Sequence, residues 1–315
     1  MTVDQPARTV RIDEASGQRI DNYLARILKG IPRSRIYQMI RKGEVRVNGG
    51  RVKPTHRLHA GDRVRIPPVR QAVNAAQAFI GERQLGVLEA AILHEDDRLL
   101  VLDKPAGLAV HGGSGVAFGA IEALRRLRPG VPLELVHRLD RDTSGVLLIS
   151  KRRSTLRALH AHLRAGTVEK FYRLIVHGQW PHTLTRVEQP LTRYLTPSGE
   201  RRVRVDPEGK PSLTTFEIDA HAAQATLLTA ELHTGRTHQI RVHCRAAGHS
   251  ILGDAKYASE AELAWDLARG VRRLSLHASR ITLPEDGGVR TFEAPMPAEL
   301  HTLWQRLERS APEDG

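Results

Sequence analysis

Residues 137–145 (HRLDRDTSG) place two carboxylates among two arginines. The segment lies beside the apolar run 146–149, and its Asp, Thr, Ser and Gly content is typical of a tight loop at the end of a strand. An aspartate with arginine neighbours stays ionised, and an ionised carboxylate can act as a nucleophile. Asp140 and Asp142 are therefore candidate catalytic groups, although turn residues with surface ion pairs have the same composition.

A second polar segment, 233–243 (HTGRTHQIRVH), contains three histidines. Its alternation of polar and apolar residues predicts a strand over 237–242, in which His238 and His243 face opposite sides. Their spacing of five also differs from the spacing of four in a helical zinc pair. We therefore expect no metal site here, and we expect Arg241 to lie on the polar face of the strand.

A third segment, 169–178 (EKFYRLIVHG), places Tyr172 near two basic residues. With 5 Phe, 5 Tyr and 3 Trp in 315 residues, aromatic side chains are scarce. A tyrosine flanked by Lys170 and Arg173 is a candidate platform on which a nucleic-acid base could stack. The alternative is an aromatic side chain in the core of a strand.

The chain around these segments is predicted to consist mostly of strands. Strands are expected over 99–102, 172–176, 213–218 and 226–232, and helices over 120–127, 155–163 and 298–307. Residues 136–150 are expected to form a strand, a polar loop and a second strand. Because several strands follow one another without room for a crossover helix, we expect an α+β fold with a mixed or antiparallel sheet and a central cleft.

The first part of the chain predicts a small module of its own. Its expected elements are two helices and two short strands, over 19–28, 35–42, 45–47 and 64–66. Ser34 is expected to cap the second helix, and Asn48-Gly49 is a hairpin turn signal. The pattern therefore indicates a helix–helix–hairpin unit.

Positive charge is concentrated in this module. Residues 1–70 hold 16 Lys and Arg against 6 Asp and Glu, so they carry +10 of the net charge of +13. Arginine supplies 40 of the 48 basic residues, and it binds phosphate through paired hydrogen bonds. GC-rich codon usage explains that ratio equally well, but it does not explain the clustering. We expect a phosphate-binding surface formed by Arg33, Arg35, Arg41, Lys42 and Arg46.

Length and composition limit the remaining possibilities. We expect a basic domain over 17–67, a linker over 68–86 that is rich in proline and small residues, and a second domain over 87–312. The single cysteine, Cys244, excludes an internal disulfide and a zinc site with several cysteines. Since the chain has neither an apolar run of about 18 residues nor an apolar N-terminal segment, we expect a cytoplasmic protein.

Two resemblances to known families follow from these motifs. Residues 17–67 resemble the S-four type RNA-binding domain through RIDNYLARIL, PRSRIYQMIRKGEVRVNG and LHAGDRVRI. Residues 92–300 resemble the pseudouridine synthases that modify ribosomal RNA, through LDKPAGLAVHGGSG, HRLDRDTSG, KFYRLIVHG, HTGRTHQIRVHCRAAGHSILGDAKY and LHASRITL, in that order. Within that family, GQRIDNYL, VHGGSG and the N-terminal domain are most similar to the large-subunit type C group.

The resemblance implies an enzyme that isomerises specific uridines to pseudouridine in large-subunit (23S) ribosomal RNA. It implies that Asp140 attacks the uridine, at the ribose C1′ or on the base, and that Arg241 is its cationic partner. Tyr172 would stack on the flipped-out base and help to remove a proton from its carbon, and Arg138 would fill the gap that the base leaves. No redox change or hydrolysis occurs, so no cofactor or metal is expected. Further substrate contacts are expected from His137, Arg141, Thr143 and Ile240.

Two other classes of function remain open at this point. A non-catalytic RNA-binding or ribosome-assembly factor explains the basic module, but not the polar segments of the second domain. A glycosidase or nuclease would use Asp140 and Asp142 as a pair, but neighbours on a tight loop rarely have the separation that such a pair needs. We expect a monomer that binds large-subunit ribosomal RNA, naked or in an early assembly intermediate, and that does not bind membranes.

Overall fold

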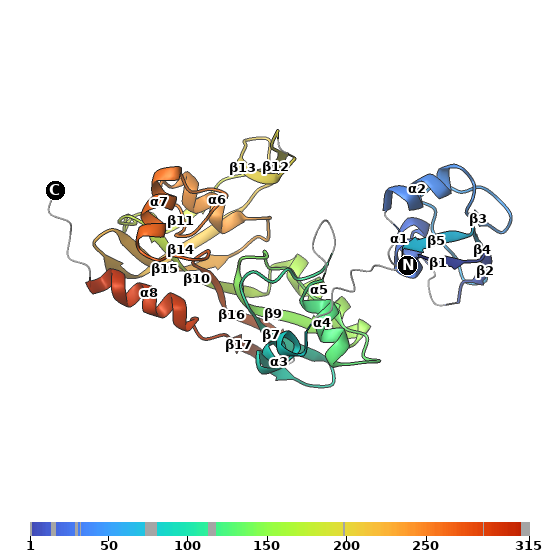
Figure 1. Ribbon diagram of the computed structural model, residues 1–315, viewed down its shortest axis with the longest axis horizontal. Coiled ribbons are helices and arrows are strands. Elements are labelled where there is room, and N and C mark those ends of the chain that lie inside the picture. Colours follow the sequence, from blue (N-terminus) through green and yellow to red (C-terminus); the bar gives the residue numbers. More distant parts are fainter. Residues whose placement is uncertain are drawn as a thin grey trace. The chain divides into compact units, whose positions relative to one another are not determined.

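The computed structural model forms two compact units, Met1–Phe79 and Ile80–Gly315 (Figure 1). It describes residues 2–13, 17–28, 31, 33–72, 81–112, 118–197, 199–285 and 287–309. Both units combine helices with strands, which confirms the predicted α+β class. Within the described ranges, no helix is both long enough and apolar enough to cross a lipid bilayer.

The first unit packs two helices against a small antiparallel sheet. Its elements are β1 (Thr2–Gln5), β2 (Arg8–Arg11), α1 (Ile20–Ile27), α2 (Arg33–Arg41), β3 (Arg46–Val47), β4 (Arg63–Ile66) and β5 (Val69–Ala72). The sheet has the order β2-β4-β3, and β1 pairs with β5 separately. Apolar residues at helical spacing, Ile20 and Leu24 in α1 and Ile36 and Met39 in α2, are buried with Val64 of β4 in one core.

Some details of this unit differ from the prediction. Helix α2 begins at Arg33, so Ser34 lies inside its first turn; helix ends commonly differ by a residue or two between sequence and structure. The turn at Asn48-Gly49 is confirmed, with φ values of 50° and 82°. The expected linker 68–86 is too long, because β5 pairs with β1 and helix α3 begins at Glu82. Residues 73–80 of that linker lie outside the described ranges.

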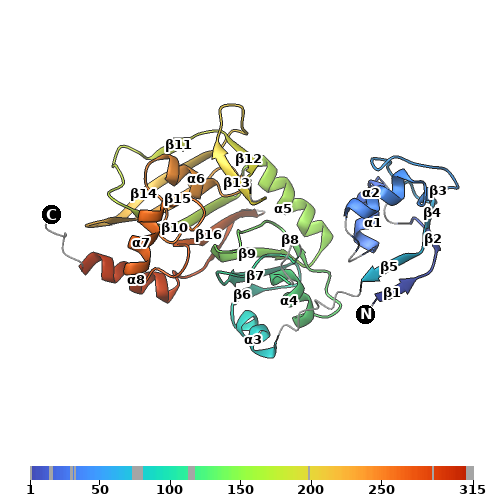
Figure 2. The same ribbon diagram turned by 45° about the horizontal axis from the view of Figure 1, so that its top comes forward.

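The second unit is built on one large sheet. Its remaining elements are α3 (Glu82–Ala90), β6 (Ile92–Glu95), β7 (Leu99–Lys104), α4 (Ala120–Leu127), β8 (Glu134–Leu135), β9 (Ser144–Ser150), α5 (Arg153–Ala165), β10 (Glu169–His177), β11 (Arg186–Glu188), β12 (Leu191–Leu195), β13 (Arg201–Val205), β14 (Leu213–Ala222), β15 (Ala225–Leu232), α6 (Gln239–Ala246), α7 (Glu260–Ala268), β16 (Leu276–Glu285), β17 (Gly288–Glu293) and α8 (Ala298–Arg309). The strand order is β11-β14-β15-β10-β16-β9-β7-β6, with β17 beside β16 and β8 beside β9 (Figure 2). Strands β16 and β9 run parallel and their neighbours antiparallel, which confirms a mixed sheet.

Helices cover both faces of this sheet, because successive strand residues point to opposite sides. In β9, Leu147 and Ile149 pack with α3, α4 and α6, whereas Val146 and Leu148 pack with α5 and β17. Farther along the sheet, Ile175 of β10 is buried with residues of α8. The unbroken apolar run in β9 is therefore explained by burial on both faces.

The middle of the sheet brings two of the predicted segments together. Gly145 of β9 lies opposite Ala278 of β16, and Ala278 lies opposite Tyr172 of β10. Gly145 has φ 109°, and a Cβ atom there would lie 2.2 Å from the carbonyl oxygen of Ala278. Only glycine allows this approach. The loop before β9 and the side chain of Tyr172 therefore meet at one place.

One element that matters for function was predicted incorrectly. The expected strand 237–242 is instead the start of helix α6, Gln239–Ala246. Alternating polar and apolar residues indicate a strand only when the polar side is solvated, and here Gln239, Arg241 and His243 are all buried. His243 hydrogen-bonds to the hydroxyl groups of Ser212 and Thr214, so its polarity is satisfied inside the fold.

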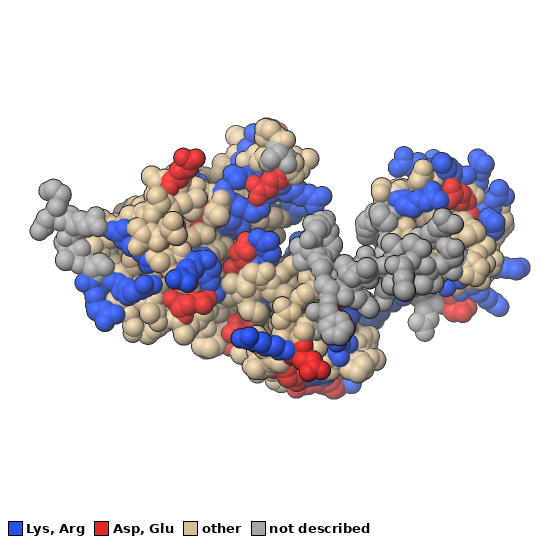
Figure 3. Space-filling view, viewed as in Figure 1, with Lys and Arg blue, Asp and Glu red and all other residues tan. Residues whose placement is uncertain are grey.

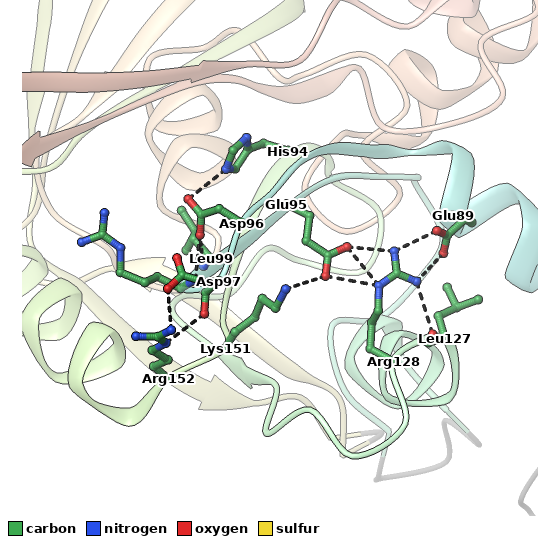
Figure 4. A network of polar contacts seen from close by, with 11 residues as sticks. Glu89, His94, Glu95, Asp96, Asp97, Leu99, Leu127, Arg128, Lys151 and Arg152 are labelled. Carbon is green, nitrogen blue, oxygen red and sulfur yellow. Dashed lines mark hydrogen bonds and ion pairs between the residues drawn. The ribbon is translucent and has the colours of Figure 1, made fainter.

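A network of ion pairs joins the edge of the sheet to its helices (Figure 4). Arg128, directly after α4, lies 2.8 Å from Glu89 of α3 and 2.8 Å from Glu95 of β6. Glu95 is also paired with Lys151, which follows β9, at 2.8 Å. These contacts connect α3, α4, β6 and β9, and they therefore stabilise this edge of the sheet.

Candidate active site

A cavity in the second unit collects the polar segments singled out above. It is lined by Arg138, Leu139, Asp140, Thr143, Tyr172, Leu232, Gly235, Arg236, His238, Gln239, Ile240, Arg241 and Leu276. These residues come from the loop before β9, from β10, β15 and β16, from the segment that leads into α6, and from the first turn of α6 itself. The cavity thus brings together all three segments in which the sequence indicates chemistry.

The loop that carries Asp140 is held from inside the protein by Lys104. The Lys104 side chain is fully buried, and Nζ donates to the carbonyl oxygens of Pro105, Leu108 and Arg141 at 2.9, 2.8 and 3.0 Å. Burial lowers the pKa of Lys104 to about 7. The Asp140 carboxylate is 29% exposed, so it remains accessible from the cavity.

Arg241 is the buried cation beside Asp140. Its Nη1 lies 3.5 Å from Oδ2 of Asp140. Its Nε and Nη2 donate to the carboxylate of Asp254 at 2.8 and 2.6 Å, and the two side chains are 3% and 1% exposed. Burial acts against the charge of Arg241, but the hydrogen bonds and charge of Asp254 outweigh it, so the pKa of Arg241 is raised. Asp254 therefore fixes a permanent positive charge beside Asp140.

Asp254 is itself positioned by its backbone surroundings. The preceding Gly253 has φ 74°, and a Cβ atom there would lie 2.1 Å from the carbonyl oxygen of Arg273. Gly253 N–H donates to Asp266 of α7 at 2.8 Å. Lys256 N–H donates to Oδ1 of Asp254 at 3.0 Å. A tight turn thus orients the carboxylate that holds Arg241.

His238 forms the side of the cavity next to these charges. Its Nε2 lies 3.7 Å from Oδ2 of Asp140, and its Nδ1 shares a hydrogen bond of 2.6 Å with the hydroxyl of Tyr257. The side chain is 12% exposed. Burial lowers the pKa of His238; the charge of Asp140 opposes this effect, and the charges of Arg241 and Lys256 add to it, so that the pKa is lowered on balance. The imidazole is therefore neutral near pH 7.

Tyr172 contributes an aromatic wall. Its side chain is 8% exposed and belongs to the apolar core, as well as lining the cavity. Burial raises the pKa of Tyr172, and the negative charge of Asp140 raises it further. The phenol therefore stays protonated at neutral pH.

The other predicted site residues of the second unit are divided between the cavity and the scaffold. Arg138, Thr143 and Ile240 line the cavity. His137 does not; its Nε2 accepts the N–H of Leu148 at 3.1 Å, which stabilises the loop. Arg141 lies outside the lining and pairs with Asp142 at 3.0 Å, at the surface. Within the described ranges, no group of three His, Cys, Asp or Glu residues is arranged to hold a metal ion.

The predicted basic residues of the first unit lie on and beside α2, and Figure 3 shows many Lys and Arg side chains around this unit. Arg35, Arg41, Lys42 and Arg46 are exposed. Arg35 pairs with Glu44 at 3.1 Å, and Arg46 Nε donates to the carbonyl oxygen of Gly43 at 3.3 Å. Arg33 is the first residue of α2, and its side chain lies outside the described part of the structure.

Several cavity residues were not predicted as functional. The sequence pattern suggests His238 only as a candidate metal ligand, and it assigns no role to Arg236 or Gln239. Asp254 lies 13 residues after Arg241 in the chain, so its pairing with Arg241 depends on the tertiary fold. A signal was nevertheless present: an aspartate after glycine in an otherwise apolar stretch (ILGDA) needs a buried partner.

Comparison with known proteins identifies the family of this chain. The family model described as RNA pseudouridylate synthase matches residues 98–246, and the S4 domain model matches residues 18–64. The chain is 51% identical over 308 residues to "Ribosomal large subunit pseudouridine synthase C" of Escherichia coli (strain K12), with 96% of each chain covered. The chain belongs to the RNA pseudouridylate synthase family. This confirms the family resemblance of the sequence, including the type C group.

Other relatives extend the comparison. The protein of the same name from Haemophilus influenzae is 51% identical over 306 residues, covering 96% of this chain and 95% of its own. Among solved structures, "Human RNA Pseudouridylate Synthase Domain Containing 4" matches with a TM-score of 0.61 and 25% identity, over 75% of this chain and 99% of that chain. The chain is accordingly an RNA pseudouridine synthase, with an S4 domain before its catalytic unit.

Proposed function

We propose that this enzyme converts specific uridines of large-subunit ribosomal RNA to pseudouridine, with Asp140 as nucleophile on a flipped-out uridine. The observation that carries the proposal is the single cavity that holds the exposed Asp140 carboxylate beside the buried Arg241. The names of the relatives, which share about half of the sequence over nearly the whole chain, support the choice of RNA.

In the proposed mechanism, the Asp140 carboxylate adds to the ribose C1′ and the bond from C1′ to N1 of uracil breaks. The base then turns within the cavity, and its C5 forms a bond to C1′ as the Asp140 oxygen leaves. Arg241 keeps Asp140 ionised and orients it, because its own position is fixed by Asp254. No redox change takes place, so the proposed reaction needs no cofactor or metal.

Tyr172 is proposed to stack on the uracil ring while the ring turns. An aromatic face tolerates rotation of a stacked base, whereas directional hydrogen bonds would oppose it. A neutral phenol ring suits this role. The Tyr172 phenol stays protonated, and therefore neutral, because burial raises its pKa. Arg138, exposed at the rim of the loop, is proposed to fill the gap that the flipped base leaves. Thr143 and Ile240 would complete the walls of the cavity.

The first unit is proposed to bind the RNA backbone. Its exposed arginines and Lys42 provide contacts to phosphate that do not depend on sequence. We propose naked ribosomal RNA or an early assembly intermediate as the partner, a monomer as the active form and the cytoplasm as its location. Arg141 and His137 do not line the cavity. We propose that Arg141 contacts the RNA from the protein surface, and that His137 stabilises the loop that carries Asp140.

A hydrolase with two carboxylates is a weaker candidate. The described lining of the cavity contains one carboxylate, Asp140, whereas Asp142 is paired with Arg141 outside it. Hydrolysis by two carboxylates requires both at the same bond.

The test is to incubate the enzyme with an unmodified large-subunit rRNA transcript and to measure pseudouridine at each position. The expected result is pseudouridine at a few uridines, with no chain cleavage and no released uracil. Cleaved RNA or free uracil without pseudouridine would overturn the proposal. Mapping the pseudouridines of a deletion strain would then identify the natural targets.

A further inference from the structure

The proposed isomerisation moves a proton as well as a base. When C5 replaces N1 as the atom bonded to C1′, C5 must lose its hydrogen as a proton and N1 must gain one. The overall reaction is therefore balanced without any co-reactant. A group at the cavity must accept the proton at neutral pH and then give it up again.

The described lining of the cavity offers few groups that can do this. Its titratable side chains are Arg138, Asp140, Tyr172, Arg236, His238 and Arg241. Arginines do not release protons in proteins. The Tyr172 phenol holds its proton, because burial raises its pKa. In the proposed mechanism Asp140 is bonded to the sugar until C5 replaces its oxygen at C1′. His238 is then the group of the described lining that can accept a proton and that stays unbonded to the substrate throughout.

His238 is held in an unusual conformation at this position. Its backbone is left-handed, with φ 54° and ψ 20°, and it directly precedes α6. Among the described residues, the other non-glycine position with a positive φ is Asn48, which lies in a hairpin turn. Strained backbone of this kind is tolerated where a side chain must be aimed at a site. Here it places the imidazole between Asp140 and Tyr257.

We propose that His238 is a further catalytic residue, which takes the proton from C5 and returns it to N1, and that Tyr257 positions its ring. This inference rests on the proposed function. Nε2 would accept the proton, because His238 lines the cavity, its Nδ1 is engaged by Tyr257, and Nε2 lies 3.7 Å from Asp140, beyond hydrogen-bonding distance. Nδ1–H would donate to the Tyr257 hydroxyl oxygen, which also accepts the N–H of Val203 at 3.0 Å.

The step is balanced in atoms and charge. After C5 has bonded to C1′, the C5–H bond breaks, its electron pair returns to the ring, and the proton moves to Nε2. The imidazolium formed lies next to the carboxylate of Asp140, which is free again once the bond to C1′ has broken. Proton transfer from Nε2 to N1 then completes pseudouridine and restores the neutral imidazole.

The charges around the ring suit a base of this kind. Asp140 faces it from the loop before β9, Arg241 from α6, and Asp254, Lys256 and Tyr257 from the segment before α7. The two cations oppose protonation and the two carboxylates favour it, whereas burial makes the largest contribution and favours the neutral form. His238 is thus neutral before the reaction, with Nε2 able to accept a proton, and it has a carboxylate nearby to stabilise the charge that it acquires.

The experiment compares His238→Gln with the full-length wild type under single-turnover conditions. The substrate is an rRNA transcript with either tritium or deuterium at C5 of uridine. The variant is expected to bind RNA with unchanged affinity, to release tritium at least about 100-fold more slowly, and to show a larger deuterium isotope effect. The wild-type rate should decrease as the pH is lowered, with a midpoint below the ordinary imidazole pKa of about 6.5. This decrease at acidic pH, the acid limb of the pH profile, should be absent from the variant.

Two further variants make the test decisive. His233→Gln changes a histidine of the same segment that does not line the cavity, and it should keep the wild-type rate. Tyr257→Phe keeps the ring but removes the hydroxyl, and it should slow tritium release about tenfold. If His238→Gln does not fold, a wild-type rate in Tyr257→Phe would overturn the positioning role.

The proposal fails if His238→Gln folds and releases tritium within about threefold of the wild-type rate with an unchanged pH profile. It also fails if the variant is slow but shows no change in isotope effect and keeps the acid limb, because the histidine would then act only on structure. A wild-type enzyme that forms no pseudouridine would instead refute the proposed function itself. The two failures are therefore distinguishable.

Discussion

The pair formed by Arg241 and Asp254 makes a quantitative prediction about stability. Both side chains are almost completely buried, and two hydrogen bonds of 2.6 and 2.8 Å join them. Removing one partner of such a pair leaves a buried charge without compensation, which costs about 3–5 kcal/mol. Arg241→Met and Asp254→Asn should each lower the free energy of unfolding by this amount. For a unit of this size, the midpoint of thermal unfolding would fall by about 6–20 °C.

The tryptophans allow the second unit to be followed separately. Trp180, Trp265 and Trp304 all lie in the unit Ile80–Gly315, and they are the three tryptophans of the chain. Denaturant unfolding monitored by tryptophan fluorescence therefore reports on this unit alone. Arg245→Met is a matched control, since Arg245 lies on the same helix but is 47% exposed and pairs with Glu262 at 3.3 Å. It should change stability by less than about 1 kcal/mol.

The double variant tests the physical reason for the effect. If an unpaired buried charge is the main cost, Arg241→Met combined with Asp254→Asn should cost clearly less than the sum of the single changes. The two single variants should differ in activity, because Arg241→Met also removes the cation beside Asp140. Single costs below about 1 kcal/mol, or a strictly additive double variant, would refute the reasoning.

Further predictions concern charge, pH and RNA binding. Asp140→Asn should abolish turnover and keep RNA binding, whereas Asp142→Asn should lower turnover only slightly. Near-normal turnover in Asp140→Asn would refute the assignment of Asp140 as the nucleophile. EDTA should leave activity unchanged, and a loss that zinc restores would contradict this. His277 is fully buried, and burial lowers its pKa to about 4, so the unfolded chain binds a proton that the folded chain does not between pH 6.5 and 4. His277 should thus contribute up to about 3 kcal/mol to the fall in unfolding free energy as the pH drops through that window, and His277→Gln should show a correspondingly smaller fall than the wild type. A fragment starting at residue 81 should bind rRNA more weakly and with a shallower salt dependence than the full chain; equal slopes would mean that the first unit does not contact RNA.

Much of the fold follows from local patterns in the sequence. Helix α4 matches its prediction, and the strands predicted over 99–102, 172–176, 213–218 and 226–232 all lie within β7, β10, β14 and β15. These segments have strong periodicity or unbroken apolar runs, and their burial agrees with their pattern. The hairpin β12–β13 was not predicted, because its strands are mostly exposed and charged and each buries one residue, Leu191 and Val203, which is too few for a recognisable pattern.

The error at α6 had a specific cause and a functional consequence. A buried helix with polar residues at every second position resembles a strand when only its sequence is considered. Read as a strand, the segment would expose Arg241 and separate His238 from it. In the helix, His238 lies at the N-terminal end and Arg241 one turn later, so both reach the same carboxylate, Asp140. The residue types of the site were thus predictable, but their geometry depended on the fold.

The parallel pairing of β9 with β16 explains why these distant segments meet. Parallel strands begin at the same edge of a sheet, so the loop before β9, which carries Asp140, lies beside the segment before β16. That segment contains Arg273, whose carbonyl oxygen closely approaches Gly253 and so fixes the turn that orients Asp254. Asp254 in turn holds Arg241 against Asp140. Asp140 and Arg241 are therefore positioned from one edge of the sheet, and the glycines at 145 and 253 allow the close backbone contacts that this arrangement requires.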